Sequence, residues 1–253
     1  PYRTYRDYFN VSTAIAVSQE SGIGTVNTIR RTKFETTFAG GVGLRGDYSA
    51  IFNYAMKVSP VDESNLNQSL IIVTPNTIDY GGITEMWEDG STIAFCPLSE
   101  DTYPYDARGI IQHEAGGHGF GKLGDEYIYH NGFIEFCCPL DFATLNHGKS
   151  LGWYENLSLT GKMHEVPWSH LIFDDRYSDV VDIYEGGFKH ARGVFRSEQN
   201  SCMNNNISYF SAISREAIVK RIMEYAGESY SFEKFVENDK RDAVNSLYRS
   251  AER

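Results

Sequence analysis

One short segment of the chain gathers residue types that can bind a metal ion and move a proton. Residues 110–127 read IIQHEAGGHGFGKLGDEY, with His113, Glu114 and His118 followed by Asp125. Neutral imidazoles and carboxylates are common protein ligands of zinc, and a carboxylate beside such ligands can act as a general base on a metal-activated water. The segment therefore predicts a metal centre with hydrolytic chemistry.

The spacing of the two histidines departs from that of the common zinc-hydrolase helix, HExxH, in which the two imidazoles lie one turn apart on one face. His113 and His118 are five residues apart, which on a regular α-helix leaves their side chains about 140° apart around the axis. A π-bulge absorbs one extra residue and restores a shared face. Gly116 and Gly117 lie inside the interval and ease that distortion, so we predict a bulged zinc helix.

A tetrahedral catalytic zinc site needs a third protein ligand and keeps one position for water. Gly121 follows His118 by three residues, which suits a helix end whose next loop delivers that ligand. We predict Asp125 as the third ligand, with Glu126 and then His130 as alternatives. A carboxylate that only shapes the turn is the other interpretation of Asp125.

The overall composition excludes several classes of protein. The chain has 253 residues, with 23 Lys and Arg against 34 Asp and Glu, so its formal net charge is −11. Such an acidic chain offers no basic surface for nucleic acid. It contains no apolar run of about 18 residues, so we expect no membrane span. Its hydrophobic fraction of 41% is enough to form a core.

The elements that must position the metal-binding segment have an α/β pattern. A helix is predicted over residues 47–58, and the helix that carries the histidines begins near Tyr105. The predicted strands, with the second and fourth as edges, are 10–18, 33–38, 70–73 and 91–96. The remaining predictions are irregular structure with short helices over 127–200, a long helix over 212–225 and a charged helical tail over 231–253. We predict one domain over residues 1–253, with an upper sheet-and-helix part to about residue 121 and a lower irregular and helical part from about 122.

The run HExxxHxxGxxxDEY at residues 113–127 resembles the metallopeptidase family named for bacterial IgA peptidase, within the metzincin group. Residues 10–22, 184–196 and 201–203 also resemble segments of that family, so the similarity covers nearly the whole chain. It implies a metzincin-like zinc peptidase domain, with a twisted mixed β-sheet, an active-site helix and an irregular C-terminal half. It also implies a protein that is secreted, periplasmic or at the cell surface, and a separate N-terminal domain missing from this chain.

The residues and the resemblance together assign roles at the predicted centre. His113, His118 and Asp125 would hold one zinc ion, and Glu114 would take a proton from the activated water and pass it to the leaving amine. In this family a methionine turn underlies the metal, and Met203 in Ser-Cys-Met matches it. Met203 would be an apolar floor under the ligands, with an ordinary core methionine as the alternative.

Supporting groups are less sharply defined by the sequence. Tyr127 and Tyr209 are candidates to hydrogen-bond the developing oxyanion, although a structural role is the alternative for each in a chain with 17 Tyr. Arg196 could clamp a substrate carboxylate, or it could pair with Glu185 or Glu198.

Other clusters of polar residues carry weaker patterns. An acidic run could bind calcium, but it has no Gly to form the tight turn of a calcium loop, which favours a solvated loop: Asp174, Asp175, Asp179 and Asp182. Four further histidines are scattered without ligand spacing: His147, His164, His170 and His190. The four cysteines, of which Cys137 and Cys138 are neighbours, are either free thiols or paired.

These inferences favour a secreted zinc endopeptidase that acts on a polypeptide substrate, such as a host or dietary protein. Two alternatives remain open. One is a catalytically impaired metal-binding scaffold, or a glycan- or protein-binding one. The other is a zinc amidase that cleaves cell-wall or glycan amides with the same activated water.

Overall fold

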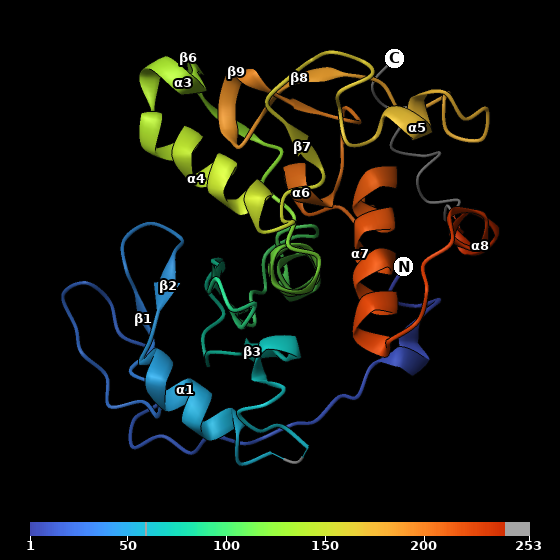
Figure 1. Cartoon of the computed structure of the whole chain (residues 1–253). Coiled ribbons are helices and arrows are strands. Elements are labelled where there is room, and N and C mark those ends of the chain that lie inside the picture. Colours follow the sequence, from blue (N-terminus) through green and yellow to red (C-terminus); the bar gives the residue numbers. More distant parts are fainter. Residues whose placement is uncertain (59, 241–253) are drawn as a thin grey trace.

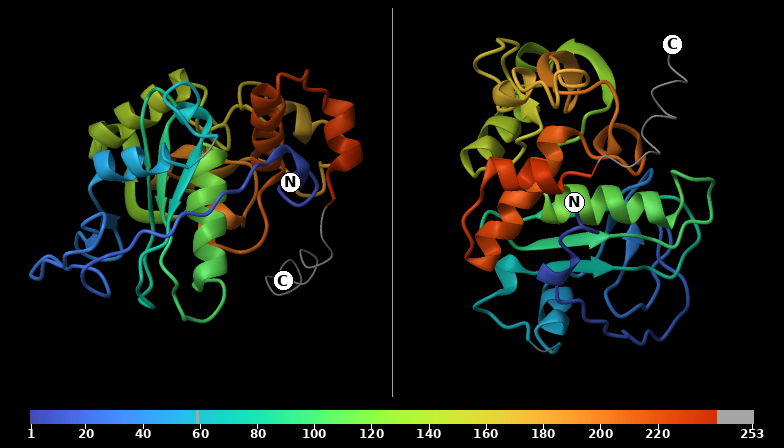
Figure 2. Two further views of the ribbon diagram at one scale, coloured as in Figure 1. Left: turned by 90° about the horizontal axis from the view of Figure 1, so that it is seen from below. Right: turned by 90° about the vertical axis from the view of Figure 1, so that its right-hand side faces the viewer.

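The structure is a computed structural model of the chain and describes residues 1–58 and 60–240. A central helix, formed by α2 (Ala107–Ile110) and η3 (Ile111–Phe120), lies between two parts that each contain a sheet (Figure 1). The part formed by earlier residues holds α1 (Tyr48–Ala55), and the part formed by later residues holds α3 (Ile134–Cys137) and α4 (Pro139–Ser150). Figure 2 shows the central helix running lengthwise between the two parts, so both of them position its side chains.

The first part contains a three-stranded sheet whose order is β3-β5-β4. The central strand β5 (Thr92–Phe95) pairs in parallel with β3 (Leu70–Val73) and antiparallel with β4 (Ile83–Met86). All four residues of β5 are buried, as expected for a short apolar run at a sheet centre. The predicted strand at 70–73 is confirmed. The edge position predicted for 91–96 is wrong, because the unpredicted strand β4 forms that edge.

The predicted strand at residues 10–18 is wrong. That segment has no regular secondary structure, and Val11, Ile15 and Val17 are more than 80% exposed. Strand preference reflects packing and pairing with neighbours, which this segment lacks. Of the predicted strand at 33–38, only β1 (Thr37–Phe38) forms, paired with β2 (Leu44–Arg45). Two short 3-10 helices are present, at Leu66–Gln68 (η2) in this part and at Arg6–Tyr8 (η1), where the Tyr8 hydroxyl donates to Glu228 in the last third of the chain.

The second part contains a four-stranded sheet that the sequence did not predict. Strand β9 (Lys189–Arg196) pairs in parallel with β6 (Ile128–Phe133) and antiparallel with β7 (Leu157–Ser158) and β8 (Tyr184–Gly187). The short helix α5 (Ser169–Ile172) follows β7. The strands were missed because β6 is mostly exposed and β8 ends in two glycines, so neither shows apolar alternation.

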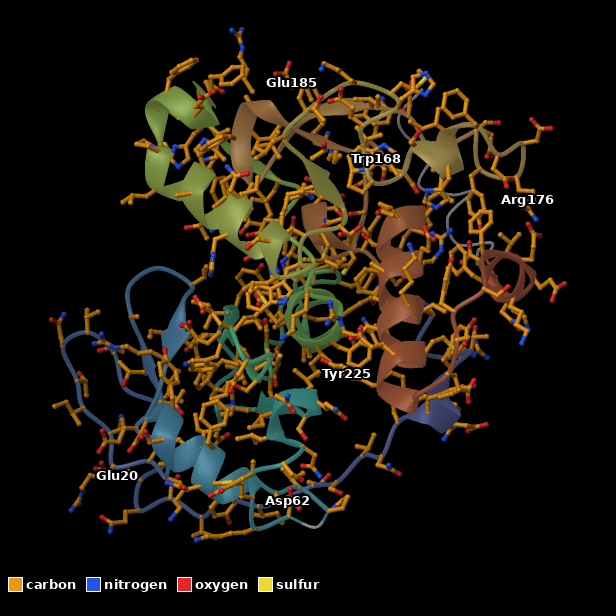
Figure 3. The ribbon with its side chains drawn as sticks, viewed as in Figure 1. Glu20, Asp62, Trp168, Arg176, Glu185 and Tyr225 are labelled. Carbon is orange, nitrogen blue, oxygen red and sulfur yellow. The ribbon has the colours of Figure 1, made fainter. Side chains whose placement is uncertain are left out.

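The last third of the chain supplies the packing behind the central helix. Helix α7 (Ala212–Ala226) confirms the predicted long helix and ends at Gly227, which has the left-handed conformation usual for such ends. Tyr225 of α7 packs against Phe120 with ring centroids 5.9 Å apart (Figure 3). The tail begins with α8 (Phe232–Asn238), as predicted, and residues 241–253 lie outside the described residues.

The mixed α/β class is therefore confirmed, while the metzincin-like fold and the single-domain interpretation stay predictions. None of the described helices is long and apolar enough to cross a lipid bilayer. The four cysteines are free thiols, with Cys96 and Cys202 buried and Cys137 exposed.

A lysine is buried just after the end of the central helix, in the following loop. Lys122 is 2% exposed, and its ammonium donates to the carbonyl oxygen of Gly90 at 2.9 Å and to the hydroxyl of Thr92. Burial lowers the pKa of Lys122 from 10.5 to about 7. The native state thus carries a cost at neutral and acidic pH, where this side chain is charged.

We expect Lys122→Met to make the protein more stable at low pH and to change its pH dependence. Between the native pKa near 7 and the unfolded value near 10.5, the unfolded chain binds more protons, so the free energy of unfolding of the wild type rises with pH. The variant should exceed the wild type by a few kcal/mol below pH 7, and its advantage should shrink toward pH 10.5. Denaturant unfolding across this window measures the difference, and a difference independent of pH would contradict the assignment.

Candidate metal centre

The helix that carries the predicted ligands has the distorted form that their spacing requires. Helix α2 (Ala107–Ile110) is capped by the side chain of Asp106, which accepts from the backbone N–H of Gly109. It continues directly into a π-helix, η3 (Ile111–Phe120). The predicted i→i+5 distortion is thus confirmed, and it extends over ten residues instead of a single bulge.

The π-helix and the following loop bring the three predicted ligands together. The Nε2 atoms of His113 and His118 are 3.1 Å apart, and they lie 3.2 and 3.0 Å from Oδ1 of Asp125. Two donor atoms about 2.1 Å from a tetrahedral zinc ion lie about 3.4 Å from each other. The donor set and its spacing therefore fit zinc, and all three side chains are less than 15% exposed.

Backbone groups fix the orientation of both imidazole rings. The Nδ1–H of His113 donates to the carbonyl oxygen of Cys202 at 2.9 Å, and that of His118 donates to the carbonyl oxygen of Leu123 at 2.7 Å. Each Nε2 lone pair is then directed at the space between the three donor atoms, as in metal-bound histidines.

Charge at the centre favours a cation. Although burial opposes the shift, the two histidines hold the pKa of Asp125 well below its usual range. Burial likewise acts to lower the pKa of His118, but the Asp125 carboxylate raises it to about 9. The three residues therefore stabilise one positive charge between them, either a proton or a metal ion.

Met203, predicted as a floor beneath the ligands, packs against the helix that carries the two histidines. It is completely buried in α6 (Cys202–Asn205), and its sulfur occupies the space where a Cβ atom on Gly117 would lie, between the two histidines of η3. A glycine at this position of the π-helix is needed for such close approach.

Glu114 faces β4, an edge strand of the three-stranded sheet. The Thr84 hydroxyl lies 2.9 Å from Oε2 of Glu114 and 2.8 Å from its carbonyl oxygen. A Cβ on Gly82 would lie 2.8 Å from the other carboxylate oxygen, so only glycine leaves room for this side chain. Sequence reasoning missed Thr84, since a lone threonine on a short strand carries no recognisable pattern.

Of the two candidate tyrosines, only Tyr127 lies beside the ligands. Its ring stacks on that of His113, with centroids 6.4 Å apart and planes at 19°. Burial, followed by the Asp125 carboxylate, raises the pKa of Tyr127 above its usual 10, so the phenol keeps its proton at neutral pH. The hydroxyl of Tyr209 instead donates to Glu198 at 2.6 Å.

Glu126, the alternative ligand, takes part in a separate buried network. Its carboxylate accepts from the Asn156 side chain at 2.9 Å and from the Ser201 hydroxyl, and its backbone N–H donates to the carbonyl oxygen of Met203 at 2.7 Å. Glu126 thus ties the loop that bears Asp125 to the methionine segment and does not reach the ligand set.

The other proposed alternatives also lie elsewhere. His130 is on β6, with its ring 5.2 Å from that of His190. Arg196 donates to the carbonyl oxygens of Glu185 and Gly186 at 3.2 and 2.7 Å, so its guanidinium braces β8 against β9.

The acidic run is not among the groups of possible metal ligands that the described residues bring together. Asp174 is paired with Arg176 at 2.6 Å, which lowers the pKa of Asp174 to about 2. Among residues 1–58 and 60–240, two groups of three His, Cys, Asp or Glu side chains are close enough to hold a metal ion, and neither includes this run.

A cavity of about 1900 Å³ lies on the opposite side of η3, against the N-terminal segment. Gln112, Ala115 and Phe120 line it, whereas the three ligands do not. The predicted ligands therefore lie outside this cavity.

No protein-family model matches the chain, and no curated protein shows significant similarity to it.

Proposed function

We propose that this protein is a zinc-dependent endopeptidase. The observation that carries the proposal is the convergence of His113, His118 and Asp125, whose donor atoms lie within 3.2 Å of one another. Glu114 follows His113 directly in the sequence, and its charge helps to raise the pKa of His118. Zinc bound there would polarise the scissile carbonyl and lower the pKa of a water molecule to about 7.

The chain's own residues supply the remaining chemistry. Glu114 accepts the proton of the attacking water and passes it to the leaving amine, and Thr84 holds its carboxylate in place. Tyr127, whose phenol hydrogen-bonds Asp125, keeps its proton at neutral pH and would donate to the oxygen on which negative charge develops.

A polypeptide substrate is favoured by the strand next to Glu114. Among the described strands, β4 pairs only with β5, which leaves its other edge with unpaired N–H and C=O groups. An extended peptide can add to such an edge as a further strand. Because Thr84 belongs to β4, a peptide bound there would pass close to Glu114.

One contact favours the alternative of an impaired metal-binding scaffold. The Lys189 ammonium lies 3.7 Å from Oδ2 of Asp125, and a cation at that distance weakens a carboxylate as a metal ligand.

We expect the full chain to cleave casein in the presence of zinc, to lose this activity with a chelator and to regain it when zinc is restored. His118→Ala should abolish cleavage together with zinc binding at this centre. His130→Ala is a matched control, because this histidine lies outside the ligand set and should leave both unchanged. Zinc binding without cleavage of casein would indicate a scaffold, and cleavage of peptidoglycan fragments alone would indicate an amidase.

A further inference from the structure

A second cluster of metal-binding side chains lies in the part of the chain that follows η3. The donor atoms of Cys137, Cys138 and His190 all lie within 4.8 Å of one another. Cys137 ends α3, Cys138 directly precedes α4, and His190 is the second residue of β9. The fold thus brings two soft sulfur donors to an imidazole from a distant part of the sequence.

The spacing and the orientation of His190 suit a bound ion. The sulfur of Cys137 lies 3.6 Å from Nδ1 of His190. Sulfur at about 2.3 Å and nitrogen at about 2.1 Å from a tetrahedral zinc ion lie about 3.6 Å apart. His190 is completely buried, and its Nε2–H donates to Asp141 at 2.8 Å, which leaves the Nδ1 lone pair facing the sulfur.

We propose that Cys137, Cys138 and His190 form a second zinc site, separate from the centre on η3. Two thiolates and one imidazole are a ligand set that selects thiophilic cations such as zinc. Binding releases the two thiol protons to solvent, and the exposed side of Cys137 leaves the fourth position open to water.

An ordinary disulfide does not compete with this site. The Cα atoms of adjacent residues are about 3.8 Å apart, closer than the roughly 4.4 Å at which disulfides usually begin. Both cysteines are free thiols in the structure.

The second site supports the loop that carries the third ligand of the first. An ion there joins the α3–α4 junction to the start of β9. Immediately before His190, the N–H of Phe188 donates to the carbonyl oxygen of Asp125 at 2.7 Å, and that of Lys189 donates to the carbonyl oxygen of Tyr127 at 3.0 Å. Fixing His190 therefore fixes the strand that borders the Asp125 loop.

Cobalt(II) binding to the reduced, metal-stripped full chain tests the proposal, because only a thiolate site produces a sulfur-to-cobalt charge-transfer band in the near ultraviolet. We expect the wild type to show this band. The double variant Cys137→Ser/Cys138→Ser should lose it together with one bound ion, and both positions are accessible enough for serine to be tolerated. His118→Ala should keep the band, since it removes only the ion on η3.

Asp141→Ala should retain the band but weaken cobalt binding at this site by about 10- to 100-fold, because the carboxylate orients His190. Absence of the band in the reduced wild type, or its persistence in the double serine variant, would overturn the second site. Neither result bears on the endopeptidase proposal, which depends on His118 and on cleavage of casein.

Discussion

Glu114→Gln should remove nearly all hydrolytic activity and leave zinc binding unchanged. The amide has the same shape and can still accept the hydrogen bond from Thr84, but it cannot take a proton from water. Loss of a general base typically lowers the rate by about 10²- to 10⁴-fold. We therefore expect kcat/KM to fall within that range while elemental analysis finds as much zinc as in the wild type.

Two variants of Thr84 separate the chemistry of Glu114 from its placement. Thr84→Val keeps the shape but loses the hydroxyl that lies 2.9 Å from the carboxylate, so kcat should fall by about tenfold with zinc retained. Thr84→Ser keeps the hydroxyl and should stay near wild-type activity. Full activity in Glu114→Gln would show that another group is the base.

Gly109→Ala should be among the most destabilising single methyl additions to the helix that carries the ligands. A Cβ at this position would overlap the carbonyl group of Pro104 and lie 3.2 Å from the carbonyl oxygen of Asn206. Both obstacles are backbone, which cannot rotate away as a side chain can. We expect a loss of about 3 kcal/mol or more in the free energy of unfolding, as in overpacked cores. Zinc affinity should also fall, because His113 begins the next turn.

Gly116→Ala is the matched control in the same helix. Its Cβ would meet only ring atoms of Tyr2 at 3.1 Å and Phe210 at 3.5 Å, so both contacts are to side chains and neither is to backbone. Both substitutions gain the same helix propensity, about 1 kcal/mol. Urea unfolding of the two variants therefore isolates the effect of the backbone contact. Equal stability of Gly109→Ala and Gly116→Ala would contradict the observed path of α2.

The sequence alone also predicted several elements well. The short apolar run at 70–73 and the apolar stripe of 212–225 each correspond to an observed element. In both cases the pattern that predicts the element lies wholly within the segment. Residues 10–18 had an equally strong strand pattern but form no strand. A strand needs a neighbour in space, and the sequence does not show whether one is available.

What the sequence determined at the first centre was which three candidate ligands come together and the form of the helix that carries two of them. Two histidines five residues apart can lie on one face of a helix only if the backbone has i→i+5 hydrogen bonds in place of the i→i+4 bonds of an α-helix. The spacing and the glycines together therefore predicted the π-helix. Asp125 was predictable because it is only a short loop away from His118. These relations are local, and local backbone geometry follows from the order of residues.

Only the tertiary structure decided which distant groups serve these ligands. Thr84 reaches Glu114 across 30 positions, and His190 reaches Cys137 across 53, a pairing that the spacing of the histidines gave no reason to expect. The tertiary structure also shows that Glu126 and Arg196, which the sequence offered as functional groups, hydrogen-bond to other parts of the chain. Contacts of this kind depend on how the two parts of the chain pack around one helix, which is set by the burial of the whole chain and not by any single motif.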